Sequence, residues 1–182
     1  MELELWNHPA CPNQAVDRID VCVDRPSATR VRLVYEVAGR VGDLLLPPRI
    51  PAQRANNLWR TTCFEAFLRP AGHISYLEFN FAPSTQWAAY NFAAYRDGMV
   101  QASLPAAPEI AVDIQPGRLR LEVDLSLDLP HEPYRLGLSA IIEERRGYKS
   151  CWALNHPSGG DASPDFHHHS CFDVDLPPAP QP

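Results

Sequence analysis

Two glutamates occupy neighbouring apolar segments in which a charged side chain is unexpected. Glu65 lies in CFEAFL, and Glu78 lies in YLEFNF between Tyr76 and Asn80. Side chains alternate between the two faces of a strand, so a hairpin across residues 69–73 brings both carboxyl groups to one face. Carboxylates beside an aromatic ring and an amide are typical of a concave surface that holds a ligand. The sequence therefore predicts that these four side chains lie together.

The alternative is an ordinary structural or solvated role, because glutamates on the outward face of an antiparallel strand are common. The two roles differ in their electrostatics. A partly buried carboxylate has a raised pKa and needs a cationic partner to stay ionised. The nearby Trp59-Arg60 pair makes Arg60 the predicted partner.

A second group of polar residues follows the last long apolar segment. Trp152 is followed by Asn-His-Pro with His156, and a glycine-containing loop leads on to Asp165 and His167. Loops at the end of a rigid scaffold commonly carry function. The sequence predicts a binding mouth here, with either histidine as an alternative acid or base.

The run His167-His168-His169 raises the question of a metal ion. Consecutive side chains of an extended segment point to opposite sides, so at most two of them can share one ion. The remaining ligand set that zinc or copper requires is not evident elsewhere. The sequence therefore predicts no metal site.

Three tryptophans, Trp59, Trp87 and Trp152, have two interpretations. Large aromatic side chains commonly anchor the interior of a β-sandwich, and we expect at least one of the three to do so. The functional interpretation is a flat platform on which a sugar ring or another planar ligand stacks.

The elements that must position these residues are strands, because apolar and polar residues alternate with a period of two. The pattern is complete in 118–125 and nearly so in 30–37. Other predicted strands are 15–23, 62–68, 75–82, 87–95, 109–114, 135–143, 148–154 and 171–175. Residues 86–96 also fit a helical stripe, but their aromatic content favours a strand. Short strands separated by proline, glycine, asparagine and aspartate predict an all-β antiparallel sandwich of the immunoglobulin-like or jelly-roll-like kind.

Composition narrows the classes of partner. The 182 residues carry a formal net charge of −6 and contain no basic run. Binding to nucleic acid or to an anionic membrane requires clustered lysine and arginine, so the sequence predicts neither partner. No segment approaches the ~18 apolar residues of a membrane span.

The sequence also predicts a cellular compartment and a domain organisation. Residues 1–20 lack the charged and apolar regions of a secretory signal, and the five cysteines contain no CxxC pair. Reduced thiols in the cytoplasm are the expectation. We expect one domain over 1–176 and a proline-rich disordered tail over 177–182.

Several segments, taken in order, resemble the DOMON-like family of bacterial proteins. They are LWRTTCFEAFL, YLEFNFAPSTQWAAYNFAAYRDGM, GLSAIIE, SCWALNHP and DFHHHSCF, which together span roughly residues 3–176. That superfamily is similar to family-nine carbohydrate-binding modules and to haem- or sugar-binding DOMON domains. The resemblance implies a β-sandwich with a ligand site on the concave face of a sheet or between the sheets.

The resemblance also implies site residues. Sugar-binding modules use paired aromatic rings flanked by polar side chains, and the candidates here are Trp59, Trp87, Trp152, Arg60, Glu78 and Asn80. Haem-binding DOMON domains use a methionine and a histidine as axial ligands. Met99 with His156 or His167 is the candidate pair.

Four functions remain open from the sequence. The leading hypothesis is a non-catalytic module, monomeric or homodimeric, that binds a carbohydrate or a sugar-containing metabolite without a cofactor. The second is an enzyme that uses Glu65 and Glu78 as acid and base, as glycoside chemistry does. The third is haem or metal binding, and the fourth is a module whose aromatic surface docks a protein.

Overall fold

The computed structural model describes residues 1–130, 132–157 and 163–178. These residues form twelve strands and three short 3₁₀ turns. No helix in this part of the chain is long and apolar enough to cross a membrane. The strands are β1 (Glu2–Asn7), β2 (Val16–Ser27), β3 (Arg30–Gly39), β4 (Cys63–Pro70), β5 (Tyr76–Phe81), β6 (Trp87–Phe92), β7 (Val100–Gln101), β8 (Glu109–Gln115), β9 (Arg118–Ser126), β10 (Tyr134–Glu143), β11 (Lys149–Ala153) and β12 (Val174–Leu176). The turns are η1 (Val41–Asp43), η2 (Leu58–Arg60) and η3 (His169–Cys171).

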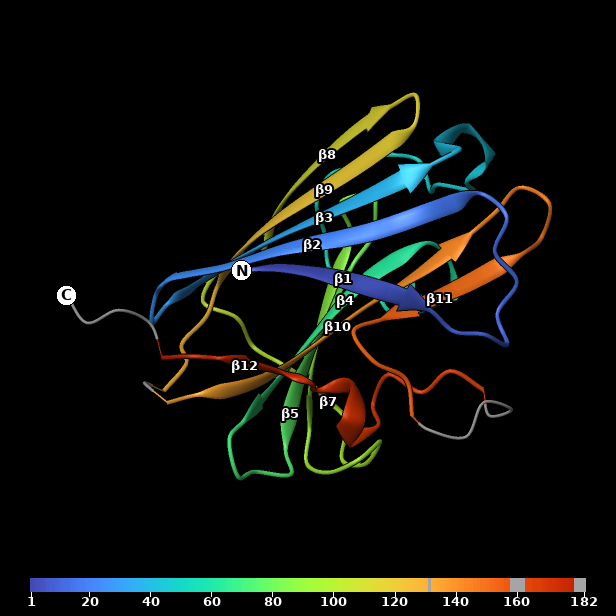
Figure 1. The fold of residues 1–182 in the computed structure, drawn as a ribbon. Helices are drawn as coiled ribbons and strands as arrows, with labels where there is room; N and C mark the ends of the chain where they lie inside the picture. The colour runs from blue at the N-terminus through green and yellow to red at the C-terminus, as the bar shows by residue number, and fades with distance from the viewer. Residues whose placement is uncertain (131, 158–162, 179–182) are drawn as a thin grey trace.

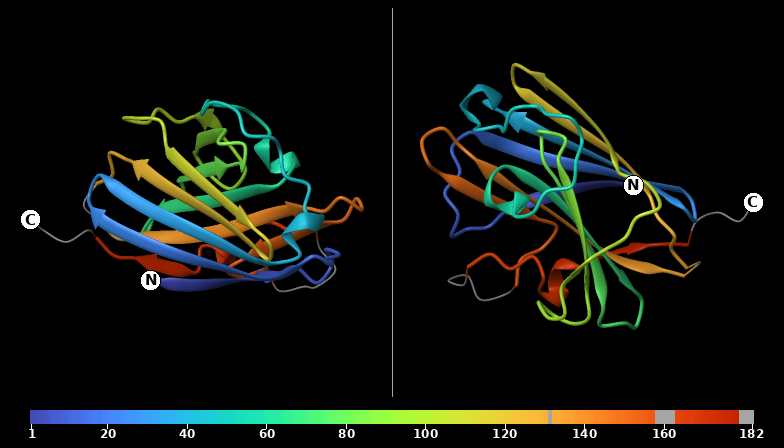
Figure 2. Two further views of the ribbon diagram at one scale, coloured as in Figure 1. Left: turned by 90° about the horizontal axis from the view of Figure 1, so that it is seen from above. Right: turned by 180° about the vertical axis from the view of Figure 1, so that it is seen from behind.

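The pairings between these strands are antiparallel, and they follow the order β7-β6-β5-β4-β10-β11-β1-β2-β3-β9-β8, with β12 beside β10. The strand path folds over at β1. Residues Glu2 to Leu5 pair with β2, whereas Trp6 and Asn7 pair with β11. The result is two layers of one curled sheet, β2-β3-β9-β8 and β11-β10-β4-β5-β6 (Figures 1 and 2). This is the all-β antiparallel sandwich that the sequence predicts.

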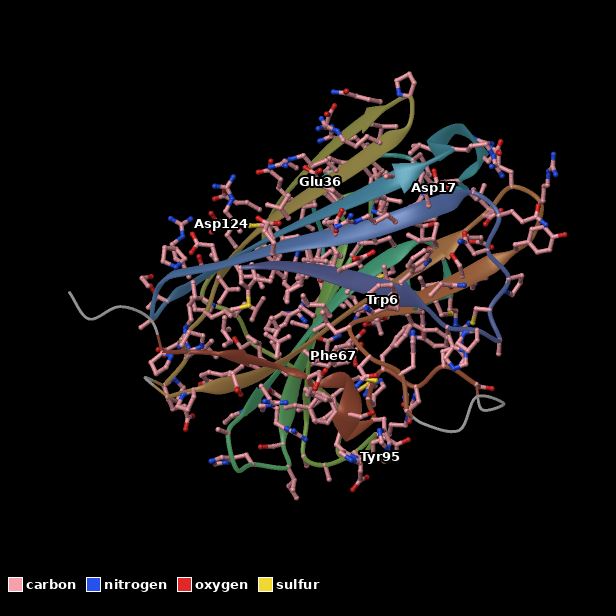
Figure 3. All side chains as sticks on the ribbon, in the orientation of Figure 1. Trp6, Asp17, Glu36, Phe67, Tyr95 and Asp124 are labelled. Carbon is pink, nitrogen blue, oxygen red and sulfur yellow. The ribbon has the colours of Figure 1, made fainter. Side chains whose placement is uncertain are left out.

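The first layer forms because apolar and charged residues alternate along most of β3 and all of β9. Val31, Leu33, Tyr35 and Val37 of β3 are at most 2% exposed and face the core. The intervening charged residues of β3 and β9 pair across the outer face, as Arg32 does with Glu122 at 2.7 Å. Figure 3 shows Glu36 and Asp124 on this outer face. Apolar burial on one face and cross-strand charge pairs on the other stabilise the layer.

The second layer is buried on both faces. Phe64, Ala66 and Phe79 of β4 and β5 belong to the core between the layers. Cys63 and Phe67, on the opposite face of β4, belong to a second apolar cluster with Phe166 and Phe172. The chain after β11 therefore covers part of the outer face of this layer, and η3 lies there in red (Figure 1).

Most strand predictions are confirmed, including the β4–β5 hairpin across 69–73 and a strand rather than a helix at 87–92. Several details differ. β6 ends at Phe92 and not at the predicted residue 95, because the N–H groups of Ala93 and Ala94 bond to the Asp97 carbonyl in a turn. β1 and β7 were not predicted, and the predicted strand 171–175 begins only at Val174 because the 3₁₀ turn η3 precedes it. β1 divides its pairing between two layers and β7 has two residues, so neither shows a full alternation.

Two predictions fall partly on residues outside the described ones. They are the glycine-containing loop at 158–162 and the tail from Pro177. The described start of that tail is anchored, because the Pro177 carbonyl accepts a hydrogen bond from Arg25 Nη1 at 3.0 Å.

Candidate functional site

The outer face of β4, β5 and β6 carries a hollow of about 930 Å³. Its lining residues are Asn56, Asn57, Trp59, Glu65, Glu78, Tyr90, Phe92, Arg96, Met99, Val100, Gln101, Ile141, Lys149, Cys151, Pro164, Phe166 and His167. Ligand pockets of small molecules typically measure about 300–1,000 Å³ and combine apolar walls with a few polar groups. The second hollow, about 670 Å³, lies among the ion pairs of the β2–β3–β9 face.

Glu65 and Glu78 form the floor of the larger hollow. Glu65 lies opposite Asn80 in the β4–β5 ladder, and Glu78 lies opposite Phe67, so the two carboxyls are diagonal neighbours on one face. Their residues are only 3% and 6% exposed. Ser139 Oγ donates to Glu65 Oε2 at 2.8 Å, and Asn80 Nδ2 donates to Glu78 Oε1 at 2.5 Å. The predicted grouping of the two glutamates with the asparagine is therefore confirmed.

The electrostatics of the floor are those of buried acids. The pKa of Glu65 is raised to about 8, mainly by burial and then by the charge of Glu78, while the hydrogen bond from Ser139 opposes the rise. The pKa of Glu78 is raised by burial, against the opposing effects of Asn80 and Arg96. Two nearby carboxyls in a poorly solvated place cannot both ionise easily, so the pair retains a proton at neutral pH.

A histidine closes one side of the floor. His167 Nε2 lies 3.6 Å from Glu78 Oε2, and Nδ1 lies 2.7 Å from the Tyr76 hydroxyl. Burial, and next the charge of Arg96, lower the pKa of His167 to about 4, so the ring is neutral at pH 7. The Arg96 backbone N–H donates to the Tyr76 oxygen at 3.2 Å. When Tyr76 in turn donates to Nδ1, the proton of the neutral ring is on Nε2 and faces Glu78.

Arg96 is held at the wall by an acidic residue far away in the sequence. Its Nη2 and Nε donate to Asp165 Oδ1 at 2.8 and 3.2 Å, and the Tyr95 hydroxyl donates to Asp165 Oδ2 at 2.5 Å. Figure 3 shows Tyr95 beside the segment that follows β11. These contacts tie the loop after β6 to the chain after β11.

Aromatic rings make up much of the remaining wall. Tyr90 and Phe92 project from β6 on one face, Phe166 comes from the chain after β11, and Trp59 stands on η2 at the rim. Phe92 stacks on Tyr76, with ring centroids 4.8 Å apart, and the Tyr90 hydroxyl donates to Asn56 Oδ1 at 3.0 Å. Trp59 is 48% exposed, so about half of its surface is open to a ligand.

The structure separates the predicted site residues into three groups. Four line the hollow: Trp59, Glu65, Glu78 and His167. Three others form hydrogen bonds with lining residues: Tyr76 with His167, Asn80 with Glu78, and Asp165 with Arg96. Four lie elsewhere: Arg60, Trp87, Trp152 and His156.

Each residue of the last group has a physical reason for its position. Trp87 and Trp152 are 7% and 5% exposed and belong to the core between the layers, so neither is a binding platform. His156 Nε2 contacts the Trp6 carbonyl at 2.7 Å. Arg60 lies over the Trp59 ring at 5.4 Å, away from both glutamates, so it does not neutralise them.

Histidines and methionine were also predicted as alternative ligands. His168 and His169 pack against each other, with ring centroids 4.1 Å apart, outside the hollow that His167 and Met99 line. Within the ranges that the structure describes, no three His, Cys, Asp or Glu side chains form a group able to hold a metal ion.

Several lining residues were missed by reasoning from the sequence. Tyr90 and Phe92 had a usable signal, because they alternate along β6 with Ala89 and Asn91. Arg96 had none, since it lies in a loop and adopts a left-handed backbone with φ of 52°. Asn56 and Asn57 come from a connection without periodicity.

Known proteins resemble this chain in structure but not detectably in sequence. No protein-family model matches the chain, and no curated protein matches it. A candidate carbohydrate-binding protein from Bacteroides uniformis has a similar structure, with a TM-score of 0.64 and 14% identity over 94% of this chain and 83% of that chain. The DOMON-like resemblance thus stays a prediction.

A family-9 carbohydrate-binding module from Caldicellulosiruptor kristjanssonii is similar in two complexes. The complex with cellotriose has a TM-score of 0.53 and 11% identity over 86% of this chain and 75% of that one. The complex with glucose has a TM-score of 0.50 and 12% identity over 85% and 75%. At these identities the likeness concerns the fold, and the chain has the β-sandwich fold of these carbohydrate-binding proteins.

Proposed function

We propose that this protein is a non-catalytic module that binds a small carbohydrate in the hollow over Glu65 and Glu78. The observation that carries the proposal is the composition of one concavity, in which an exposed indole and further aromatic rings surround two buried carboxyls. The fold shared with modules solved with cellotriose and glucose supports it.

The lining residues would make two kinds of contact with a sugar, ring stacking and hydrogen bonds. The apolar face of a sugar ring would stack on Trp59, an interaction of about 0.5–1.5 kcal/mol beyond simple burial. Hydroxyl groups would exchange hydrogen bonds with Glu65, Glu78 and the Arg96 guanidinium, each contributing ~1 kcal/mol. A volume of about 930 Å³ is large enough for a sugar of one or two rings.

Titration calorimetry with glucose, cellobiose and cellotriose tests the proposal, using Trp59→Ala against Trp6→Ala. Trp6 is a matched control because it is also exposed, at 59%, but lies on β1 outside the hollow. We expect Trp59→Ala to weaken binding about tenfold, ~1.4 kcal/mol, and Trp6→Ala to leave it unchanged. Equal effects of the two substitutions, or no binding of any sugar across a broad panel, would contradict the proposal.

A second candidate, acid–base chemistry on a glycoside, is favoured by one specific observation. A carboxyl with a pKa of about 8 is protonated at pH 7 and can donate that proton. If this is the function, nitrophenyl glycosides should be hydrolysed and Glu65→Gln should abolish turnover. Hydrolysis that survives both Glu65→Gln and Glu78→Gln would exclude these residues as the acid and base.

A further inference from the structure

The floor of the hollow carries acidic groups without basic partners. In the ranges that the structure describes, no lysine or arginine forms an ion pair with Glu65 or Glu78, and the histidine facing Glu78 is neutral. Both basic residues of the lining are engaged elsewhere. Arg96 is bonded to Asp165, and Lys149 Nζ donates to the Arg60 carbonyl at 2.6 Å.

One carboxylate oxygen is aimed into the hollow without a donor. Glu65 is 97% removed from solvent, since it is 3% exposed, and its Oε2 accepts from Ser139. No donor to its Oε1 exists among the described residues, although Glu65 lines the hollow. A buried carboxylate is costly unless it is protonated or meets a cation. In the free protein a retained proton relieves this cost. No lysine or arginine among the described residues pairs with the two glutamates, so a cation that replaces the proton has to come from the ligand.

The walls suit the same kind of ligand group. Tyr90, Phe92, Phe166 and Trp59 border the hollow, and the face of an aromatic ring attracts a cation. Aromatic rings and carboxylates both attract an ammonium group, so this lining suits a cationic group as well as a sugar ring.

We propose that the hollow binds a sugar carrying a free amino group, whose ammonium lies between Glu65 and Glu78. This rests on the proposed function and narrows its ligand class from sugars in general to amino sugars. The ammonium donates hydrogen bonds to Glu65 Oε1 and Glu78 Oε2, and the sugar ring extends along Tyr90 and Phe92 toward Trp59.

Binding of the ammonium is coupled to proton release. The free carboxyl pair holds a proton, and the incoming cation displaces it to solvent. The other titratable or charged groups near the pair are Cys63 on β4, Tyr90 on β6, Lys149 and Cys151 on β11, and Arg96, Asp165 and His167 in the flanking loops. Of these, His167 is neutral above pH ~5 and Arg96 stays charged, so neither changes its charge near neutrality.

Calorimetry with glucosamine, glucose and N-acetylglucosamine tests the inference at pH ~7, where the three sugars carry an ammonium, a hydroxyl and a neutral acetamide at the same position. We expect glucosamine to bind at least about tenfold more tightly than the other two. Measurements in two buffers of different ionisation enthalpy should show release of about half to one proton for glucosamine and none for glucose. Glu65→Gln should remove the preference for glucosamine over glucose and abolish the proton release.

The outcomes distinguish this inference from the broader proposal. If glucose and N-acetylglucosamine bind as tightly as glucosamine, and Trp59→Ala weakens all three, the amino-group inference is wrong and sugar binding stands. If cyclohexylamine binds with proton release and no sugar does, the carboxyl pair recognises an amine but the sugar proposal fails. If neither the sugars nor the amine bind, both are overturned.

Discussion

A single buried carboxyl group dominates the chemistry of the candidate site. Glu65 lies at the centre of a sheet face, under a partial cover of aromatic side chains, and only Ser139 donates to it among the described residues. Its pKa of about 8 follows from this position, because burial disfavours the charged form. Glu65 therefore makes the folded protein less stable at pH values at which its carboxyl group ionises.

This gives a prediction for stability against pH. The folded pKa of about 8 lies above the reference value of 4.5, so between these values the folded state binds more protons than the unfolded state. The contribution of Glu65 to stability is therefore greatest below the lower value and falls as pH rises toward the higher one, by a few kcal/mol and at most about 5. Glu65→Gln should flatten this fall in urea titrations at pH ~5, ~7 and ~9.

A glutamate in another place serves as the control for this experiment. Glu109 lies exposed on β8, and Glu109→Gln makes the same substitution outside the hollow. The contribution of His167 to stability changes in the opposite direction at lower pH. Because its pKa is lowered in the folded state, this contribution increases as pH rises from about 4 to 6.5. Parallel curves for Glu65→Gln and the wild type above pH ~6 would show that Glu65 ionises freely.

At the scale of elements, the site depends on two connections that meet over β5 and β6. The loop after β6 supplies Arg96, and the chain after β11 supplies Asp165 and His167. The Arg96–Asp165 ion pair and the Tyr76–His167 hydrogen bond join them. Neither connection has regular structure there, so these polar contacts fix the shape of the wall.

Asp165→Asn should therefore affect binding more than stability. The Arg96 side chain is 50% exposed, so the ion pair contributes at most about 1 kcal/mol to folding. Loss of the carboxylate frees the guanidinium to turn toward the two glutamates, and glucosamine should bind several-fold more weakly. Asp124→Asn is the control, because it breaks an exposed arginine pair on the opposite layer at Arg30. Equal binding by both variants would show that the Asp165 contact is irrelevant to the site.

At the scale of the whole molecule, the site rests on the packing of the two layers. Tyr35 of β3 reaches through the core, and its hydroxyl donates to the Glu65 carbonyl at 2.7 Å. Its ring packs on Phe64, with centroids 5.1 Å apart. The first layer thus supports the strand that carries the main carboxyl group from beneath.

Tyr35→Phe should remove this support without leaving a cavity. We expect a loss of ~1 kcal/mol in the free energy of unfolding, because one buried hydrogen bond disappears while the ring remains. Tyr134→Phe is the control, since Tyr134 is equally buried but its hydroxyl contacts lie at 3.4 and 3.5 Å. Chemical denaturation compares the two, and a larger loss for Tyr134→Phe would contradict this role for Tyr35.

The sequence by itself determined what local alternation can encode. The strands, the β4–β5 hairpin and the common face of Glu65, Glu78 and Asn80 follow from side chains pointing to opposite faces at successive residues. Only the tertiary structure decided which faces become core. The sequence pattern around Trp87 and Trp152 fits a side chain on either face of a strand. Both are buried because the second layer packs against the first on the face that carries them. Trp59 and Asp165 were predicted as site residues, but their approach to the two glutamates depends on contacts distant in sequence. Arg96 comes from a connection of the same kind, and no local pattern could place it at the hollow.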